Sequence, residues 1–109
     1  MKTVLIVEDE PFLRAVLPWE LKERGLRVIA GNGKAAIDVI HTQTPDLLLL
    51  DLLIPHMDGF AVLAWLRASG HAVPTILLSN LSDPQTRQQC LEAGAAEFIV
   101  KSTLEEKEK

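Results

Sequence analysis

Five polar side chains stand at or just beyond the ends of short apolar runs that lie far apart in the sequence. They are Glu8 and Asp9 after residues 4–7, Asp51 after 47–50, Ser79 at the end of 75–79, and Lys101 after 98–100. Carboxylates about 4 Å apart repel each other by roughly 4 kcal/mol at an effective dielectric near 20, so three together require a cation. Hard oxygen ligands without His or Cys favour Mg²⁺ or Mn²⁺. Asp51 could then act as a nucleophile towards a phosphoryl group whose other oxygens bind Ser79 and Lys101.

These residues meet only if the apolar runs are neighbouring strands. The expected strands are residues 4–7, 26–30, 47–50, 75–79 and 98–100, and the expected helices are 11–24, 34–43, 57–67, 83–94 and a short one at 104–109. We expect Pro18 to kink or break the first helix, because it removes a backbone donor. Strand–helix alternation with strands buried on both faces predicts an α/β fold in which helices cover both faces of a parallel sheet. In such sheets, ligands bind beyond the carboxyl ends of the strands.

Length and composition limit the class of protein. The 109 residues carry 11 Lys and Arg against 15 Asp and Glu, a net charge of −4, and 48% of them are hydrophobic. These values predict one globular domain over residues 1–109. The single cysteine, Cys90, allows no internal disulfide. The sequence has no cluster of Lys and Arg of the kind that binds nucleic acid. The longest apolar run, residues 47–50, is too short to span a membrane. We therefore expect a small soluble cytoplasmic domain that contacts neither nucleic acid nor membrane directly.

Several segments together resemble the receiver domain of bacterial response regulators, from Lys2 to Lys101. The matching segments are residues 4–10, 45–51, 54–59, 74–79, 93–95 and 98–101. The resemblance implies a flavodoxin-like (βα)₅ sandwich of three layers, with five parallel strands in the order 2-1-3-4-5 and, in this chain, a short fifth helix. It also implies a phosphorylation-controlled signalling protein of a two-component system, which is a switch and not a turnover enzyme.

The resemblance assigns roles to individual residues. Asp51 would accept the phosphoryl group from a sensor histidine kinase or a phosphotransfer protein. Glu8, Asp9, Asp51 and the main-chain carbonyl of Leu53 would hold Mg²⁺, and Ser79 and Lys101 would contact the phosphoryl group. Ser79 and Phe98 would be the switch residues, and the surface of helix four, strand five and helix five would change its partner or form a homodimer.

Some positions depart from the family pattern. Glu8 replaces the commoner Asp, and its longer side chain can still reach a metal ion. Ser102 replaces the proline that usually follows the lysine, which makes a cis peptide there improbable. Leu53 and Leu81, which flank the path of the hydrolytic water in the family, are both apolar, so we expect slow loss of the phosphoryl group.

Two other functions compete with that of a receiver. An aspartyl phosphatase or phosphotransferase usually has a second Asp two residues after its nucleophile, where this chain has Leu53. A degenerate receiver could bind proteins independently of phosphorylation, but the acidic residues, Ser79 and Lys101 argue against it. His41, His56 and His71 share no ligand spacing and are expected to be solvated. We expect Trp65 at the edge of the core.

Overall fold

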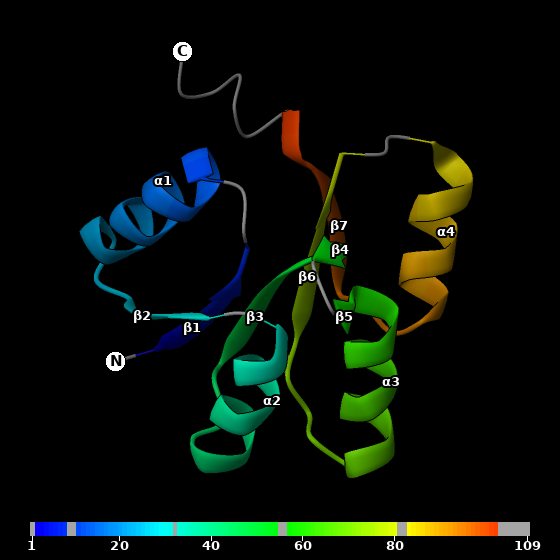
Figure 1. Ribbon diagram of the computed structural model, residues 1–109, viewed down its shortest axis with the longest axis horizontal. Coiled ribbons are helices and arrows are strands. Elements are labelled where there is room, and N and C mark those ends of the chain that lie inside the picture. The colour runs from blue at the N-terminus through cyan, green and yellow to red at the C-terminus, as the bar shows by residue number, and fades with distance from the viewer. Residues whose placement is uncertain (1, 9–10, 32, 55–56, 81–82, 103–109) are drawn as a thin grey trace.

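The computed structural model describes residues 2–8, 11–31, 33–54, 57–80 and 83–102. The main strands are β1 (Thr3–Val7), β2 (Arg27–Gly31), β3 (Leu47–Asp51), β6 (Thr75–Ser79) and β7 (Glu97–Val100). Two short strands are β4 (Leu53–Ile54) and β5 (Met57–Asp58), and the helices are α1 (Pro11–Glu23), α2 (Gly33–Thr42), α3 (Gly59–Ser69) and α4 (Pro84–Glu92). Strands and helices therefore alternate along the chain as the sequence predicts (Figure 1).

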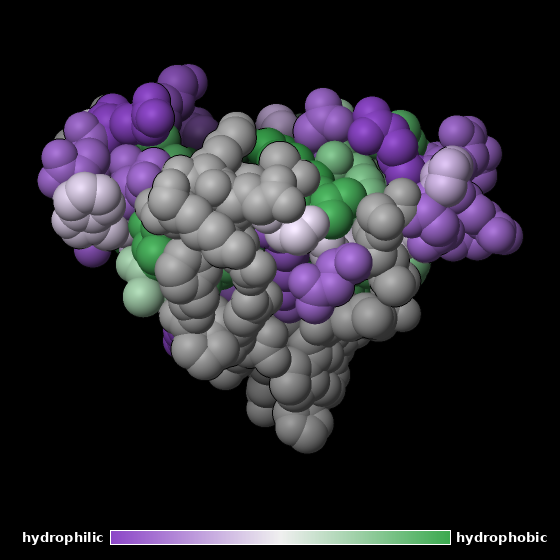
Figure 2. Space-filling view, turned by 90° about the horizontal axis from the view of Figure 1, so that it is seen from above, coloured by the Kyte–Doolittle hydropathy of each residue, from purple (hydrophilic) through white to green (hydrophobic). Residues whose placement is uncertain are grey.

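The main sheet has five strands in the order β2-β1-β3-β6-β7, and each neighbouring pair is parallel. This confirms the predicted order 2-1-3-4-5 of a flavodoxin-like fold. The sheet extends from β1 to β2 on one side and, after β2, from β3 to β7 on the other, so β1 and β3 lie side by side within the sheet. The carboxyl ends of the strands share one edge, and Figure 2 looks down on that edge, with hydrophilic residues gathered over α1 on one side and α4 on the other.

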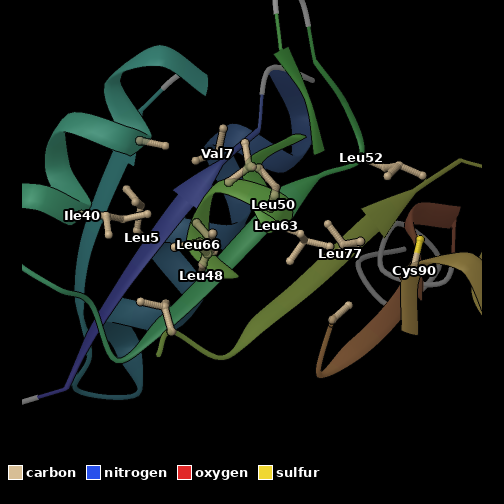
Figure 3. Packing of buried hydrophobic residues seen from close by; sticks show 14 of the residues in the cluster. Leu5, Val7, Ile40, Leu48, Leu50, Leu52, Leu63, Leu66, Leu77 and Cys90 are labelled. Carbon is tan, nitrogen blue, oxygen red and sulfur yellow. The ribbon is translucent and has the colours of Figure 1, made fainter. Parts of the chain in front are cut away.

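Two hydrophobic clusters show that helices cover both faces of the sheet. The larger cluster joins the sheet to α2, α3 and α4, and contains Leu5, Leu50, Leu77, Ile40, Leu63 and Cys90 (Figure 3). The smaller cluster joins Val4, Ile6 and Leu49 to the apolar side of α1, where Leu17 and Leu21 lie. Alternate residues of β1 therefore enter opposite layers, as expected for a strand buried on both faces.

Two local features differ from the sequence prediction, and a third prediction concerns residues outside the described ranges. The third helix begins at Gly59 and not at residue 57, because β4 and β5 form an antiparallel hairpin just before it. The kink or break expected at Pro18 is not a break, since α1 runs from Pro11 to Glu23 without interruption, and a kink there stays a prediction. Helix five was expected at residues 104–109, which lie outside the described residues. Within the described ranges, each helix is too short or too polar to cross a lipid bilayer.

Candidate functional site

The register of the sheet places Glu8 and Asp51 side by side. Val7 pairs with Leu50 across the parallel strands β1 and β3, so the next residue of each strand is an acidic one. Only 2% of Glu8 and 4% of Asp51 is exposed. Because a buried carboxylate is costly unless it is paired or hydrogen-bonded, two at neighbouring strand ends require a compensating charge.

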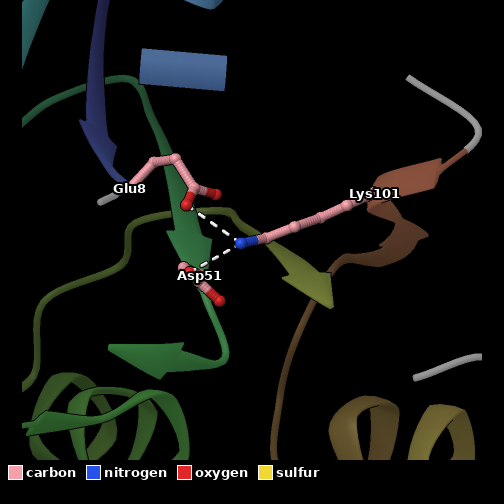
Figure 4. Close-up of polar contacts among 3 residues, drawn as sticks. All are labelled: Glu8, Asp51 and Lys101. Carbon is pink, nitrogen blue, oxygen red and sulfur yellow. Dashed lines mark hydrogen bonds and ion pairs between the residues drawn. The ribbon is translucent and has the colours of Figure 1, made fainter. Parts of the chain in front are cut away.

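Lys101 supplies that charge from the end of β7. Its Nζ donates a hydrogen bond of 2.9 Å to Glu8 Oε1 and one of 2.7 Å to Asp51 Oδ2. Figure 4 shows the lysine side chain reaching between the two carboxylates, which come from β1 and β3. Burial by itself lowers the pKa of Lys101, but the hydrogen bonds and charges of Asp51 and Glu8 outweigh burial, so the pKa is raised above its ordinary value. The ammonium is therefore fully protonated at neutral pH.

Ser79 reaches the same edge of the sheet as the last residue of β6. It pairs with Val100 of β7, the residue that precedes Lys101, and only 3% of it is exposed. Phe98, two residues earlier on β7, is buried in the larger hydrophobic cluster. The strand register therefore brings the predicted phosphoryl-binding residues Ser79 and Lys101 to neighbouring strand ends.

Two backbone hydrogen bonds hold Leu52, the residue that follows Asp51. The amide of Leu52 donates to the Leu78 carbonyl at 2.8 Å, and the amide of Gly59 donates to the Leu52 carbonyl at 2.8 Å. A Cβ atom on Gly59 would lie 2.9 Å from the Leu52 Cα, closer than such atoms approach. Glycine at position 59 thus lets the start of α3 pack directly against the residue that follows Asp51.

The described part of the site fits a hard divalent cation. Its donors are the carboxylate oxygens of Glu8 and Asp51, which are the ligands that Mg²⁺ prefers in proteins. Leu53, the predicted carbonyl ligand, lies in β4 two residues beyond Asp51. Asp9, another predicted ligand, and Leu81 lie outside the described residues.

Sequence reasoning missed one contact and one cluster. It assigned Glu8 to the metal and Lys101 to the phosphoryl group, but it did not predict the hydrogen bond between these two residues. The opposite charges at nearby strand ends could have indicated that contact. It also treated the histidines as unrelated, yet the rings of His41 and His71 lie 5.6 Å apart and both contact Trp65. His56 lies outside the described residues. Trp65 packs at the edge of the core, as predicted.

Comparison with solved structures agrees with the fold. The receiver domain of the Francisella response regulator 1452 matches with a TM-score of 0.88 at 25% identity, over 94% of this chain and 85% of that one. The BeF₃-activated N-terminal receiver domain of Klebsiella pneumoniae RstA matches with a TM-score of 0.83 at 31% identity, over 92% of this chain and 86% of that one.

Curated relatives are longer than this chain. The probable transcriptional regulator ycf27 of Guillardia theta is 37% identical over 90% of this chain, but the match covers 39% of that protein. A protein-glutamate methylesterase/protein-glutamine glutaminase of Treponema pallidum is 37% identical over 90% of this chain and 26% of its own length. The chain therefore spans about two fifths or less of these relatives.

The family model of the response regulator receiver domain matches residues 4–108. Receiver domains of this family are phosphorylated by histidine kinases, and they typically bind Mg²⁺ at the phosphorylation site. They are generally signalling modules without enzymatic activity of their own. With the matching sheet order and the acidic strand ends, this match establishes that the chain belongs to the response regulator receiver domain family of two-component systems.

Proposed function

We propose that the chain is a phosphorylation-controlled receiver in which Asp51 accepts a phosphoryl group from a sensor histidine kinase or a phosphotransfer protein. The observation that carries this proposal is the buried ammonium of Lys101 between Asp51 and Glu8, at 2.7 and 2.9 Å. The carboxylate of Asp51 is thereby held at the carboxyl edge of the sheet, next to a fixed positive charge. We further propose that residues 1–109 form one receiver domain.

The reaction is a transfer between two side chains. An oxygen of Asp51 forms the new P–O bond while the P–N bond of a phosphohistidine breaks, and the leaving imidazole nitrogen keeps the electron pair and takes up a proton. The Lys101 ammonium and the Ser79 hydroxyl donate hydrogen bonds to the phosphoryl oxygens, where negative charge is concentrated. Because both residues are buried, these hydrogen bonds act where water screens them little.

The metal ligands of the proposed site are Glu8, Asp9, Asp51 and the carbonyl of Leu53, which would hold Mg²⁺ or Mn²⁺. The bound ion supplies positive charge to the phosphoryl oxygens. Glu8 has a second role in this chain, because its Oε1 also orients the Lys101 ammonium. A chain that lacked Glu8 would therefore lose both a metal ligand and an anchor for the lysine.

Phosphorylation would act on the surface formed by α4, β7 and the residues after it. Ser79 would move towards the phosphoryl group, and Phe98 would adjust in the space beside it. Cys90 is the only buried residue of α4, while the first half of the helix is largely exposed. Elements with few buried contacts change conformation at low cost. This surface is where we expect a partner, an effector or a second copy of the chain to bind.

A second candidate is a degenerate receiver that binds its partner regardless of phosphorylation. Ser102 favours it, because a residue other than proline after Lys101 leaves the backbone there less constrained. The two candidates differ in one measurable property, which is whether Asp51 is modified.

Incubation with acetyl phosphate and Mg²⁺, followed by intact mass measurement, tests the proposal. We expect one phosphoryl adduct on the wild type, none on Asp51→Asn, and an unchanged adduct on Asp38→Asn, whose carboxylate is exposed on α2. No adduct should form when the metal is chelated before acetyl phosphate is added. A wild type that stays unmodified would favour the degenerate receiver, and an adduct that persists on Asp51→Asn would place the acceptor elsewhere.

A further inference from the structure

An open pocket of about 390 Å³ lies at the edge of the sheet opposite the acidic site. It is bounded by the end of α3, the loop that leads into β6, and the residues that follow α4. Its volume falls in the range of about 300–1,000 Å³ that is usual for small-molecule sites. The pocket shares none of its lining residues with the proposed phosphorylation site, so a ligand could occupy it independently.

The lining of this pocket combines apolar walls with positive charge. Leu63, Leu66 and Val73 form apolar walls, and among the described residues Arg67 and His71 are the titratable side chains that line the pocket. No carboxylate is among the lining residues that the structure describes. The pocket therefore presents an apolar surface and a permanent cation to one and the same ligand.

Arg67 is held at the pocket by a glycine. Its Nη2 lies 2.8 Å from the place that a Cβ atom of residue 94 would occupy, so the guanidinium packs on the backbone of Gly94. Across the described ranges, no ion pair joins Arg67 to a carboxylate. The planar guanidinium of Arg67 is thus positioned against Gly94. Its parallel N–H donors match the two oxygens of a carboxylate.

Ring contacts hold His71, the second titratable residue of the pocket lining. Its imidazole stacks on the indole of Trp65 with the centroids 5.3 Å apart and an interplanar angle of 24°. His41 packs against Trp65 edge-on at 5.1 Å. The amide of His71 also donates to the Leu66 carbonyl at 3.1 Å, which fixes the backbone at the end of α3. Trp65 therefore reports directly on the environment of a residue that lines the pocket.

We propose that this pocket binds a small carboxylate with an apolar body. The carboxylate would accept hydrogen bonds from Arg67, with His71 beside it, and the apolar body would lie against Leu63, Leu66 and Val73. Because the carboxyl-terminal ends of α3 and α4, with their partial negative charge, border the pocket, the anion must contact the guanidinium itself. Such a ligand would bridge α3 and the segment after α4.

Phenylbutyrate is a suitable probe, with phenylbutanol and phenylbutylamine as matched molecules that differ in charge. The chain has two tryptophans, and the second, Trp19, lies 63% exposed on α1. A proton–nitrogen correlation spectrum therefore contains two indole signals, which Trp19→Phe assigns. We expect phenylbutyrate to shift the Trp65 signal saturably and leave that of Trp19 in place, and we expect the alcohol and the amine to bind much more weakly.

Two variants test whether the guanidinium of Arg67 binds the carboxylate of the ligand. Arg67→Gln should weaken binding of phenylbutyrate by about tenfold to a hundredfold, as for the loss of hydrogen bonds to a charged group. Arg87→Gln is the matched control, because Arg87 is exposed on α4 and neither it nor its ion-pair partner Glu97 lines the pocket. The proposal is overturned if the alcohol binds as tightly as the carboxylate, if Arg67→Gln binds normally, or if no Trp65 shift saturates. Because the assay requires no phosphorylation, its result is independent of the proposed function.

Discussion

Lys101 Nζ lies 2.7 Å from Asp51 Oδ2, although the two residues are 50 positions apart in the sequence. The exposed fractions of the two side chains are 4% and 5%. A buried ion pair contributes little compared with a well-packed apolar pair, but removal of one partner leaves an uncompensated charge and costs about 3–5 kcal/mol. The lysine thus has a structural role at this site before any phosphoryl group arrives.

Replacement of that lysine should destabilise the fold in a way that a metal ion corrects. In Lys101→Met, Glu8 and Asp51 keep their negative charges without the ammonium, so we expect the free energy of unfolding to fall by about 3 kcal/mol. Millimolar Mg²⁺ should restore more stability to this variant than to the wild type, because the ion replaces the missing charge. Urea unfolding with and without Mg²⁺ measures both effects.

The matched control for this experiment is Lys22→Met, which removes an exposed ammonium from the last turn of α1. Its free energy of unfolding should stay within about 0.5 kcal/mol of the wild type. Equal losses in the two lysine variants would contradict the buried ion-pair cluster.

The raised pKa of Lys101 predicts a loss of stability at alkaline pH. Burial lowers this pKa, but the hydrogen bonds and charges of Asp51 and Glu8 raise it by more than burial lowers it. The pKa in the folded chain therefore lies above that in the unfolded chain. A group of this kind contributes its full stability below the ordinary lysine pKa of about 10.4, and loses it as the pH rises through the folded pKa. The stability difference between the wild type and Lys101→Met should therefore shrink above about pH 10.4.

This comparison needs a background without Cys90. Burial raises the pKa of the Cys90 thiol, so the thiol also costs stability as the pH rises, starting from its ordinary value of about 8.5. The chain has no tyrosine to complicate the alkaline range. Urea unfolding of Cys90→Ala, with and without Lys101→Met, isolates the lysine; a difference that stays constant with pH would rule out the raised pKa.

Gly59 links the backbone beside Asp51 to the start of α3. In Gly59→Ala the new methyl group would meet the Leu52 Cα at 2.9 Å, and neither backbone can move freely. We expect a loss of roughly 1–3 kcal/mol in the free energy of unfolding, as for overpacked sites. We also expect slower labelling of Asp51 by acetyl phosphate, because Leu52 directly follows it.

Gly25→Ala provides the contrast. Gly25 has a φ of +81° but nothing within 4 Å of a Cβ atom, so its replacement strains the backbone only, at the end of α1. It should lower stability by about 1 kcal/mol and leave the labelling rate of Asp51 unchanged. A normal labelling rate in Gly59→Ala would show that this turn does not position Asp51.

Asp83 caps the amino terminus of α4, the helix of the proposed switching surface. Its Oδ2 accepts the Thr86 amide at 2.9 Å, and this bond, with the Thr86 hydroxyl, lowers the pKa of Asp83. A lowered pKa contributes stability above the ordinary aspartate value, which is lost as the pH falls through the folded pKa. Asp83→Ala should therefore speed amide hydrogen exchange in the first turn of α4 at neutral pH.

The control at this position is Asp83→Ser, which keeps an oxygen acceptor at the cap. The protection of the α4 amides at neutral pH should stay close to that of the wild type, and it should no longer fall as the pH drops through the folded pKa of residue 83. Equal exchange rates in Asp83→Ala and the wild type would mean that the cap does not hold this helix.

The sequence predicted the features that follow from the regular alternation of apolar strands and helices along the chain. Each main strand is a short apolar run, so the strand ends and the meeting of Asp51, Ser79 and Lys101 could be inferred from alternation and topology. The β4–β5 hairpin could not, because two-residue strands leave no periodic pattern and Leu53 and Ile54 resemble a continuation of the turn. The approach of His41 to His71 depends on where two helices end in space, which residue spacing does not encode.

Leu53 is expected to control the lifetime of the phosphorylated form. It lies in β4, two residues beyond Asp51, and an apolar side chain there cannot orient a water molecule for hydrolysis. We expect Leu53→Asn to speed loss of the phosphoryl group by on the order of tenfold, since an amide can position and polarise that water. Leu53→Met, which stays apolar, is the control and should decay like the wild type. Intact mass measured over time after removal of acetyl phosphate gives the three decay rates; equal decay in all three proteins would assign the lifetime to other residues.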